Sequence, residues 1–406
     1  MTKTTHYKNT AIGPIPIDWE VEKLEKITLG KGTYGINASA VPYSEDLPKY
    51  LRITDIDDEG YFTKEKLSSV DDPASKDFFL DENDIVFVRT GSTTGKSYLY
   101  DSKDGQLVYA GFLIKFTINH LKANKYFIWS YTKSDKYNNW VTTFSQRSGQ
   151  PGLNSNEYAS LQIPLPSLPE QQKIAEILST WDKAIQDTEA IIKNLEDRNK
   201  GLAFALLRDK MVNKNSKEVA LSKFLTFTPR EIEKPKEDYL ALGIRSHGKG
   251  LFHKPNSDPN AIAMDKLYEV KENDFIVNIT FAWEHAVAIV NKEDVGGLVS
   301  HRFPTYIINT DIVSVEYFKY VILQPFFRKM LENISPGGAG RNRVLSKKDL
   351  LKLKISIPIL VEQDKIAEIL NTANQEAKQY QQKLETLKLQ KKGLMQQLLT
   401  GKVRTV

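Results

Sequence analysis

Two stretches of the chain, LPEQQKIAEILST (168–180) and LVEQDKIAEILNT (360–372), repeat one another at a separation of 192 residues, with ten of thirteen positions identical. The register holds downstream, since Lys200-Gly201-Leu202 matches Lys392-Gly393-Leu394. A repeat of this kind indicates that one structural unit is used twice. Each unit is predicted to consist of a globular segment followed by a long helix. A molecule with two similar heads suits a target that has two halves.

Each repeated stretch opens a segment with the periodicity of a coiled-coil helix. No proline falls between Glu170 and Leu207, and apolar residues recur in alternating steps of four and three. Such steps average about 3.5 residues, the period that keeps one seam facing a partner helix. The predicted seams are Ile174, Leu178, Trp181, Ile185, Thr188, Ile192, Leu195, Asn199, Leu202 and Leu206 in the first helix, and Ile366, Leu370, Ala373, Ala377, Tyr380, Leu384, Leu387, Lys391, Leu394 and Leu398 in the second. The helices are therefore predicted to pair, and packing of each helix on its own domain is the alternative.

Two seam positions are polar, Asn199 in the first helix and Lys391 in the second, and both occupy the same place in the repeat. Polar seam residues cost stability but specify register and partner. A helix of about 38 residues, at about 1.5 Å per residue, spans roughly 57 Å. This length exceeds what the core of a small domain requires, so each helix is predicted to act as a spacer.

Length and composition restrict the domain organisation and the cellular setting. A chain of 406 residues is too long for one core. The predicted division is a globular domain over residues 1–166, a helix over 167–211, a second domain over 212–358 and a helix over 359–406. The absence of cysteine excludes disulfides and cysteine nucleophiles and is compatible with a cytoplasmic location. No apolar run approaches the roughly 20 residues of a membrane span, and the N-terminus does not resemble a signal peptide, so no membrane association is expected.

The net charge of +5 is a weak indication of an anionic partner. The last helix is more informative, because residues 376–406 contain seven lysines and arginines against two glutamates. This basic flank is either a solvated helix face or a surface for nucleic acid or an acidic partner.

The globular halves repeat more faintly than the helices. NDIVFV (83–88) matches NDFIVN (273–278), but the loops that follow, RTGSTTGKS (89–97) and ITFAWEHAV (279–287), are unlike. Loops carry specificity on a shared frame, so this pattern predicts two recognition modules with different targets. Ordinary drift after duplication would produce the same pattern.

Both heads are predicted to be rich in strands. Short apolar runs bounded by turn residues predict strands over residues 85–88, 112–116, 275–277 and 306–308. Helices are expected over 125–132 and 315–331, followed by glycine-rich loops over 147–154 and 335–343. The predicted class is α+β, with two similar strand-rich, mixed α/β domains separated by the two long helices.

Three sequence features resemble catalytic or metal sites but do not complete their motifs. GSTTGKS (91–97) is one residue too short between its glycines for a phosphate-binding loop and precedes a predicted strand rather than a helix. DIDDEG (55–60) begins like a calcium loop, yet Lys66 stands where the motif requires glutamate. The six histidines show no spacing typical of metal ligands. The chain is therefore predicted to be a binding protein with no catalytic residues, no metal site and no cofactor of its own.

The paired segments IPLPSLPEQQKIAEILS (163–179) and ISIPILVEQDKIAEIL (355–370) resemble the conserved regions of the specificity subunits of type I restriction–modification enzymes. GPIPIDWEVEKL (13–24), NDIVFVRTGS (83–92) and the ending KKGLMQQLLTGKVR (391–404) are similar to the same family, so the resemblance covers essentially the whole chain. It implies two target-recognition domains, each reading one half of a bipartite, asymmetric DNA sequence. It also implies that the helices form an antiparallel coiled coil, which would give the repeat a pseudo-two-fold relation.

The resemblance also implies partners. Two modification subunits would dock on the helices and hold the adenine-methylating site with its S-adenosylmethionine. Restriction subunits would add the translocase and nuclease that use ATP and Mg²⁺. The expected role of the chain is DNA recognition in phage defence, in the cytoplasm.

The diverged loops are predicted to contact double-stranded DNA, because Arg and Lys suit guanine and phosphates and Gln suits adenine. The candidates are Arg89, Thr90, Ser92, Thr93, Lys96, Arg147 and Gln150 in the first half, and Arg245, His247, Lys249, Trp283, His301, Arg302, Arg341 and Arg343 in the second. For each of them a surface charge or a structural aromatic is the alternative interpretation. Two other functions remain open for the whole chain: a scaffold whose heads bind proteins, and an enzyme with an unrecognised carboxylate site.

Overall fold

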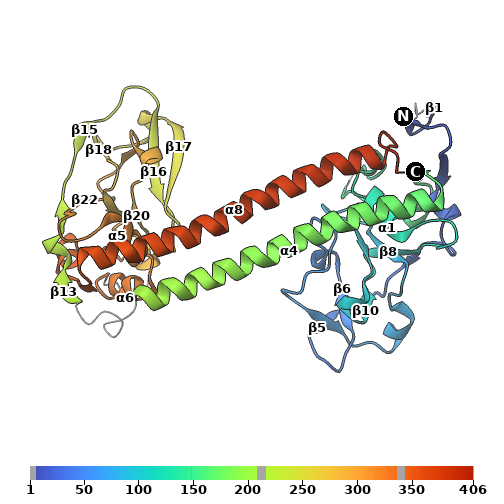
Figure 1. Ribbon diagram of the computed structural model, residues 1–406, viewed down its shortest axis with the longest axis horizontal. Coiled ribbons are helices and arrows are strands. Elements are labelled where there is room, and N and C mark those ends of the chain that lie inside the picture. The colour runs from blue at the N-terminus through green and yellow to red at the C-terminus, as the bar shows by residue number, and fades with distance from the viewer. Residues whose placement is uncertain (1–5, 148, 208–215, 336–342, 406) are drawn as a thin grey trace. The chain divides into compact units, whose positions relative to one another are not determined.

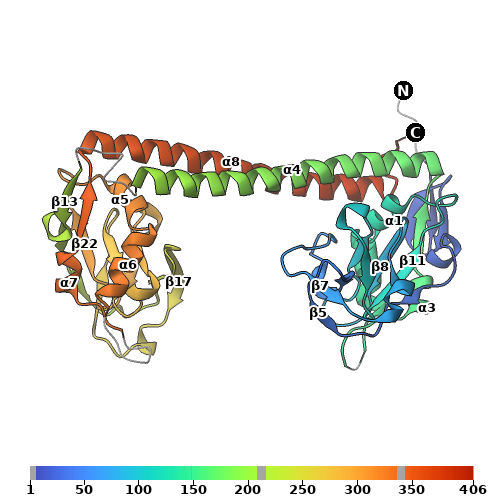
Figure 2. The same ribbon diagram turned by 90° about the horizontal axis from the view of Figure 1, so that it is seen from below.

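The computed structural model describes residues 6–147, 149–207, 216–335 and 343–405. The repeated stretches begin two long helices, α4 (Leu168–Leu207) and α8 (Leu360–Leu398) (Figure 1). The chain divides into two compact units: unit 1 comprises residues 1–189 and 382–406, and unit 2 comprises residues 190–381. Each unit therefore contains one end of α4 and the opposite end of α8 (Figure 2).

The two helices run antiparallel within each unit. In unit 1, Asp182 of α4 forms an ion pair with Lys391 of α8, and Glu189, further along α4, pairs with Lys388, which comes earlier in α8, at 2.8 Å. In unit 2, Asn199 Nδ2 donates to the Ala373 carbonyl at 2.8 Å.

The predicted seam residues lie on the inner faces of these helices. Those that are buried are Ile174, Leu178, Ile185, Thr188, Ile192, Leu195, Asn199, Ile366, Leu370, Ala373, Ala377, Lys391 and Leu398. Those that are half-buried are Trp181, Leu202, Leu206, Tyr380, Leu384, Leu387 and Leu394. The ends of the seams also belong to the globular cores, because Ile174 and Leu398 pack in unit 1 and Ile366 in unit 2.

Each repeated stretch contains a buried glutamine, and the two glutamines make equivalent hydrogen bonds, which explains why this residue occurs in both. Gln171 Nε2 donates to the Pro166 carbonyl at 2.8 Å, and its Oε1 accepts from the backbone N–H of Asn124 at 2.8 Å. In unit 2, Gln363 Nε2 donates to the Pro358 carbonyl at 2.9 Å, and its Oε1 accepts from the Ser314 N–H at 2.9 Å. Each glutamine thus joins the start of a long helix to the start of a shorter one, and a fully buried amide must find such partners.

The strands and helices of unit 1 surround an aromatic core that includes Trp19, Phe87, Phe127 and Tyr158. The strands are β1 (Tyr7–Thr10), β2 (Gly13–Pro16), β3 (Glu20–Lys23), β4 (Thr33–Tyr34), β5 (Ala40–Pro42), β6 (Lys49–Leu51), β7 (Ser68–Val70), β8 (Asp84–Val88), β9 (Ser97–Leu99), β10 (Leu107–Tyr109), β11 (Leu113–Thr117) and β12 (Gln162–Leu165). The helices are α1 (Lys125–Tyr131), α2 (Asp135–Phe144) and α3 (Ser155–Ala159), with short 3-10 turns η1 (Leu24–Lys26), η2 (Ile53–Asp55), η3 (Pro73–Phe78) and η4 (Ser102–Asp104).

Unit 2 is built on a similar plan around Phe224, Phe275, Tyr306 and Phe318. Its strands are β13 (Lys217–Ala220), β14 (Leu225–Phe227), β15 (Glu231–Glu233), β16 (Tyr239–Ile244), β17 (Leu251–Ser257), β18 (Lys266–Glu269), β19 (Phe275–Val277), β20 (Val287–Ile289), β21 (Leu298–Val299), β22 (Thr305–Ile308) and β23 (Lys354–Ile357). Its helices are α5 (Val315–Val321), α6 (Pro325–Asn333) and α7 (Lys347–Lys352), with η5 (Leu221–Lys223), η6 (Pro259–Ala261), η7 (Ala282–Glu284) and η8 (Lys292–Asp294).

The sheets repeat as the sequence does. The order β4-β11-β8-β9 in unit 1 corresponds to β14-β22-β19-β20 in unit 2, and all of these pairs are antiparallel. Each unit also pairs an early strand with the strand before its long helix, as β3 with β12 and β13 with β23. The predicted α+β class with two similar strand-rich domains and paired antiparallel helices is confirmed.

Two helix predictions need correction. The single helix expected over 315–331 is two helices, α5 and α6, because Pro325 has no N–H to continue α5 and starts α6 instead. Helix α2 of unit 1 was not predicted, although the Ser134 hydroxyl accepts from the Tyr137 N–H at its N-terminus as a standard cap.

The C-terminal end of the described chain is bound to the start of α4. Arg404 Nε donates to Glu170 Oε1 at 2.7 Å, and the same guanidinium pairs with Asp18 at 2.6 Å. The indole of Trp19 donates to Glu170 Oε2 at 3.0 Å. Because Glu170 is buried, these donors compensate its charge, and the ion pairs raise the pKa of Arg404 above its usual value.

Candidate nucleic-acid interface

The candidate interface of unit 1 lies at the end of β8, where three backbone segments meet. The Arg89 N–H donates to the Phe112 carbonyl at 3.0 Å, and the Arg89 carbonyl accepts from the Leu153 N–H at 2.8 Å. Further along, Gly91 N–H donates to the Pro151 carbonyl at 3.1 Å. The two loops that were predicted separately, 89–97 and 147–154, are therefore neighbours.

Two of these three backbone connections recur in unit 2 at the end of β19. The Ile279 N–H donates to the Arg302 carbonyl at 3.0 Å, and the Ile279 carbonyl accepts from the Leu345 N–H at 2.8 Å. We call each set of three segments the strand-end frame: residues 89–91, 111–112 and 151–153 in unit 1, and 279–281, 301–302 and 343–345 in unit 2. The frames match in backbone geometry while their side chains differ.

In unit 1, the frame presents Arg89, Thr90 and Phe112, and the adjoining loop residues add two hydroxyls and an amide. The Arg89 guanidinium stacks over the Tyr34 ring at 4.8 Å from its centroid, a cation–π arrangement that orients it along the surface. Ser92 and Gln150 are exposed, whereas Thr90 and Thr93 are half-buried.

The other two predicted cations of unit 1 already have partners within the chain. Lys96 Nζ forms an ion pair with the exposed Asp58 at 2.6 Å. Arg147 is paired with Glu157 and also donates to the Phe144 carbonyl at 3.0 Å. Exposed pairs of this type contribute little to stability, so exchanging the carboxylate for a phosphate has a small cost.

In unit 2, the predicted loop 245–250 rests on η7. The His247 N–H donates to the Glu284 carbonyl at 2.7 Å, and Arg245 donates to the Leu251 carbonyl at 2.8 Å. His247 adopts a φ of 63°, in the left-handed region, so its exposed imidazole is set by the turn. Lys249 is exposed and has no ion-pair partner among the described residues.

The frame of unit 2 is more basic than that of unit 1. Arg302 and His301 are exposed at the start of the segment that leads into β22. Arg343 lies over the Trp283 ring at 5.3 Å from its centroid, and the buried Trp283 indole N–H has no acceptor among the described residues. Arg341, also predicted to contact DNA, lies outside the described residues.

One histidine near this frame is structural. His285 is buried, and one ring nitrogen hydrogen-bonds the Ile322 carbonyl at 2.6 Å. Burial lowers the pKa of His285 below its usual value and outweighs the opposing effect of this hydrogen bond. The imidazole is therefore neutral near pH 7 and does not add a charge for DNA.

Two aromatic residues of unit 1 that lie at this interface were not among the predicted DNA contacts. Phe112 was assigned to a strand, but β11 begins at Leu113 and leaves the Phe112 side chain 58% exposed. Tyr34, which lies under Arg89, is 41% exposed. Aligning the halves at an offset of 190 residues places Phe112 opposite Arg302, a residue already selected for DNA contact, and this alignment would have identified it.

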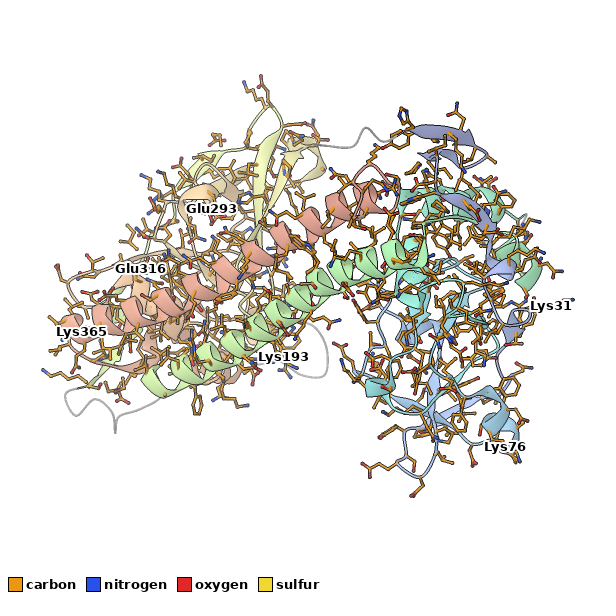
Figure 3. The ribbon with its side chains drawn as sticks, turned by 45° about the vertical axis from the view of Figure 1, so that its right-hand side comes forward. Lys31, Lys76, Lys193, Glu293, Glu316 and Lys365 are labelled. Carbon is orange, nitrogen blue, oxygen red and sulfur yellow. The ribbon has the colours of Figure 1, made fainter. Side chains whose placement is uncertain are left out.

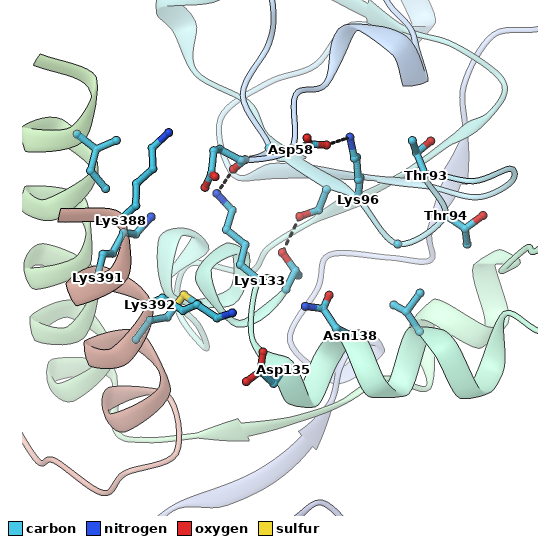
Figure 4. A pocket seen from close by; sticks show the side chains of 18 of the residues that line it. Asp58, Thr93, Thr94, Lys96, Lys133, Asp135, Asn138, Lys388, Lys391 and Lys392 are labelled. Carbon is cyan, nitrogen blue, oxygen red and sulfur yellow. Dashed lines mark hydrogen bonds and ion pairs between the residues drawn. The ribbon is translucent and has the colours of Figure 1, made fainter. Parts of the chain in front are cut away.

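A groove of about 560 Å³ in unit 1 separates these loops from α8 (Figure 4). Lys96, Lys133 and Lys392 line it together with Asp58 and Asp135. Lys133 donates to the Glu59 carbonyl and lies over the Trp129 ring, 3.2 Å from its centroid. Burial, reinforced by the charge of nearby Lys391, lowers the pKa of Lys133 to about 7.

Several exposed lysines lie outside the frames and the groove. Lys31 and Lys76 in unit 1, and Lys193 and Lys365 in unit 2, are exposed (Figure 3). No group of three His, Cys, Asp or Glu side chains in the described part of the chain could hold a metal ion. Within that same part, no helix is long and apolar enough to cross a membrane.

Comparison with protein families identifies the repeated units. The type I restriction modification DNA specificity domain matches residues 16–197 and again residues 213–389. The chain belongs to this family. It is a type I restriction–modification specificity subunit with two recognition domains, as the sequence predicted, and such subunits are non-catalytic.

Two curated relatives come from Methanocaldococcus jannaschii. The chain is 27% identical to the putative type I restriction enzyme MjaX specificity subunit over 99% of this chain and 97% of the relative. It is 23% identical to the MjaVIII specificity subunit over 96% of this chain and 94% of that protein. The fold is similar to the type I restriction–modification S subunit of M. genitalium, with a TM-score of 0.57, 15% identity and coverage of 94% of this chain and 96% of that one.

Proposed function

We propose that each recognition domain of this specificity subunit reads one half of a bipartite, asymmetric sequence in double-stranded DNA. The observation that carries the proposal is the pair of strand-end frames, which share two backbone hydrogen bonds but present different side chains. Because the two frames have similar backbones, they would position the loops of the two domains equivalently on two segments of the duplex. Different side chains on these loops would then select different bases. The proposed recognition domains are residues 1–166 and 212–358, and the helices occupy 167–211 and 359–406.

We further propose that the helices set the distance between the half-sites and dock two modification subunits. Helix α4 has 40 residues, which correspond to about 60 Å. At about 3.4 Å per base pair this length spans roughly 18 base pairs, enough to separate two contacts along one duplex.

The chemistry would reside on partner subunits in the cytoplasm. The modification subunits would hold S-adenosylmethionine and methylate adenine, and restriction subunits would use ATP and Mg²⁺ to translocate and cut DNA. In this arrangement the specificity subunit contributes recognition and spacing and needs no cofactor.

The decisive experiment compares genome-wide adenine methylation in the source cell with and without the gene. We expect one bipartite motif to lose its methylation on deletion and to regain it when the gene is restored. A methylation pattern that does not change with deletion, in cells where the modification subunits are produced, would contradict the proposal.

The salt dependence of duplex binding separates this function from a scaffold whose heads bind proteins. Each phosphate that a basic side chain neutralises contributes about −0.9 to the slope of log K against log salt concentration. A slope of several units for the assembled complex supports DNA recognition, and a slope near zero supports the protein scaffold.

A further inference from the structure

Phe112 is an exposed aromatic residue in the strand-end frame of unit 1. Its carbonyl accepts from the Arg89 N–H at 3.0 Å, as the Arg302 carbonyl accepts from Ile279 in unit 2. The side chains at these two positions therefore leave equivalent points of the two strand-end frames. In unit 2 the position carries an exposed arginine, and in unit 1 it carries a phenylalanine that is 58% exposed.

The surroundings of Phe112 suit a flat, anionic partner. A cavity of about 660 Å³ beside it is lined by Phe112, Tyr34 and Tyr50, by Arg52 and Arg89, and otherwise by small, apolar or neutral polar residues. No acidic side chain belongs to this lining in the described structure. Arg52 is paired with the buried Asp55, which lies outside this lining, at 2.8 Å, so Arg89 is the arginine of the lining without a carboxylate partner among the described residues. An apolar surface that carries such an arginine and no carboxylate complements a nucleic acid better than it complements the mixed-charge surface of a typical protein.

Two glycines in the lining of this cavity pack closely against neighbouring backbone. Gly35 lies so close to the neighbouring strand that a Cβ atom would sit 2.2 Å from the Tyr109 carbonyl oxygen, so only glycine fits there. At Gly111 an added Cβ would sit 3.3 Å from the Ile36 carbonyl oxygen. These segments therefore lie close to one another, and the neighbouring Phe112 and Tyr34 side chains are 58% and 41% exposed.

Phe112 contributes neither to a strand nor to the hydrophobic core of its unit. It lies outside β11, and its side chain does not belong to the aromatic core of unit 1, where Phe87, Phe116 and Phe127 are almost fully buried. Covering an exposed phenylalanine with apolar groups is favourable, so contact with an apolar part of the target would stabilise the complex. The apolar group that duplex DNA offers in its major groove is the 5-methyl group of thymine.

We propose that Phe112, flanked by Tyr34 and Arg89, recognises the 5-methyl group of a thymine in the first half-site. Arg302, at the equivalent point of unit 2, then reads a guanine in the second half-site. The inference rests on the proposed function and adds the chemical class of base that each domain reads at this point.

The test replaces each thymine of the methylated motif in turn with deoxyuridine, which lacks only the 5-methyl group. The full chain, assembled with its modification subunits, is titrated with each duplex. Burial of one methyl group corresponds to about a fourfold change in affinity, so we expect wild type to lose about fourfold at one thymine of the first half-site. The F112A variant should bind the thymine and deoxyuridine duplexes equally at that position.

A matched control uses the opposite end of the same strand. Leu121 follows β11 and is 73% exposed, so L121A removes a similar exposed apolar side chain away from the frame. L121A should keep the deoxyuridine effect, and both variants should unfold at the temperature of wild type.

The outcomes separate this inference from the function on which it rests. If wild type discriminates its motif but no thymine of the first half-site responds to deoxyuridine, the thymine contact is wrong and the proposed function stands. If F112A retains the response, another side chain makes the contact and the assignment to Phe112 is wrong. If the complex does not discriminate any motif, the proposed function itself fails.

Discussion

At equivalent positions between α4 and α8, unit 1 has an ion pair and unit 2 has a hydrogen-bonded pair of amides. In unit 1, Asp182 pairs with Lys391, and both side chains are about one-tenth exposed. In unit 2, the residues 192 positions away are Asn374 and Asn199, whose side chains hydrogen-bond at 3.2 Å. A charged pair in one unit thus corresponds to a pair of amides in the other.

This difference shows how a duplicated helix can select its partner. If α4 paired antiparallel with a second copy of itself in the same register, Asp182 would face Asn199 instead of Lys391. If α8 did so, Lys391 would face Asn374. Either arrangement would leave a buried charge without its counter-ion, which is far more costly than an unmatched amide. The same exchange of chemistry on a constant frame recurs in the recognition loops, where Phe112 corresponds to Arg302.

The largest effect should follow from removing the charge in unit 1. Lys391→Ala leaves Asp182 buried with the Tyr126 hydroxyl as its remaining side-chain partner, and the free energy of unfolding should fall by about 3–5 kcal/mol. Denaturant titration monitored by the tryptophans of unit 1 would measure the loss. The double variant Asp182→Asn with Lys391→Asn copies the amides of unit 2 and should recover most of it. A loss below about 1 kcal/mol in the single variant would show that the ion pair does not compensate a buried charge.

The second prediction concerns the strand-end frames, where Phe112 in unit 1 corresponds to Arg302 in unit 2. Arg302→Ala should relax one position of the second half-site by about 1–3 kcal/mol and leave the first half-site unchanged. Sequencing of methylated adenines in cells carrying the variant would report both half-sites together. Equal weakening at all sites would instead identify Arg302 as a phosphate contact.

The free energy of unfolding of unit 1 should depend on pH through Lys133, which lines the groove. Because the pKa of Lys133 is lowered to about 7 in the folded chain, the unfolded chain binds more protons between about pH 7 and its ordinary value near 10.5. Stability from this group therefore rises with pH across that window, by at most about 1.4 kcal/mol per pH unit.

The matched variant for this prediction is Lys133→Met, which removes the titrating group but keeps an unbranched side chain of nearly the same length. It should be more stable than wild type at pH 7, and the difference should shrink towards pH 9. Unfolding free energies at both pH values measure this, and a difference that grows with pH would contradict the lowered pKa.

The smallest effect is expected at the amide pair of unit 2. Asn199→Ala removes the donor to the Ala373 carbonyl and should cost about 1 kcal/mol, well below the cost of Lys391→Ala. Both variants are compared in the same denaturant titration. Equal costs would mean that the helix pair is insensitive to the charge of its polar seam residues.

Short sequence patterns were sufficient to predict many of the helices and strands. The 3.5-residue period of α4 and α8 and the apolar runs of β8 and β19 are properties of short segments, so their elements could be predicted from the sequence. The doubled stretch indicated the repeat and the family, because identity at ten of thirteen positions can be read without knowing how the chain packs. The break between α5 and α6 was missed, although Pro325 signals it locally.

Only the tertiary structure decided which side chains meet. Gln171 reaches the backbone of Asn124 across 47 residues of sequence, and loops 89–97 and 147–154 become neighbours through the backbone of Gly91 and Pro151. The pairing of Lys96 and Arg147 within the chain, and the exposure of Phe112, also depend on contacts between distant segments. Periodicity records which face of an element is apolar, whereas exposure and pairing depend on what that face meets after folding. For this reason the sequence alone determined the elements and the family, and the arrangement of the recognition surface came from the fold.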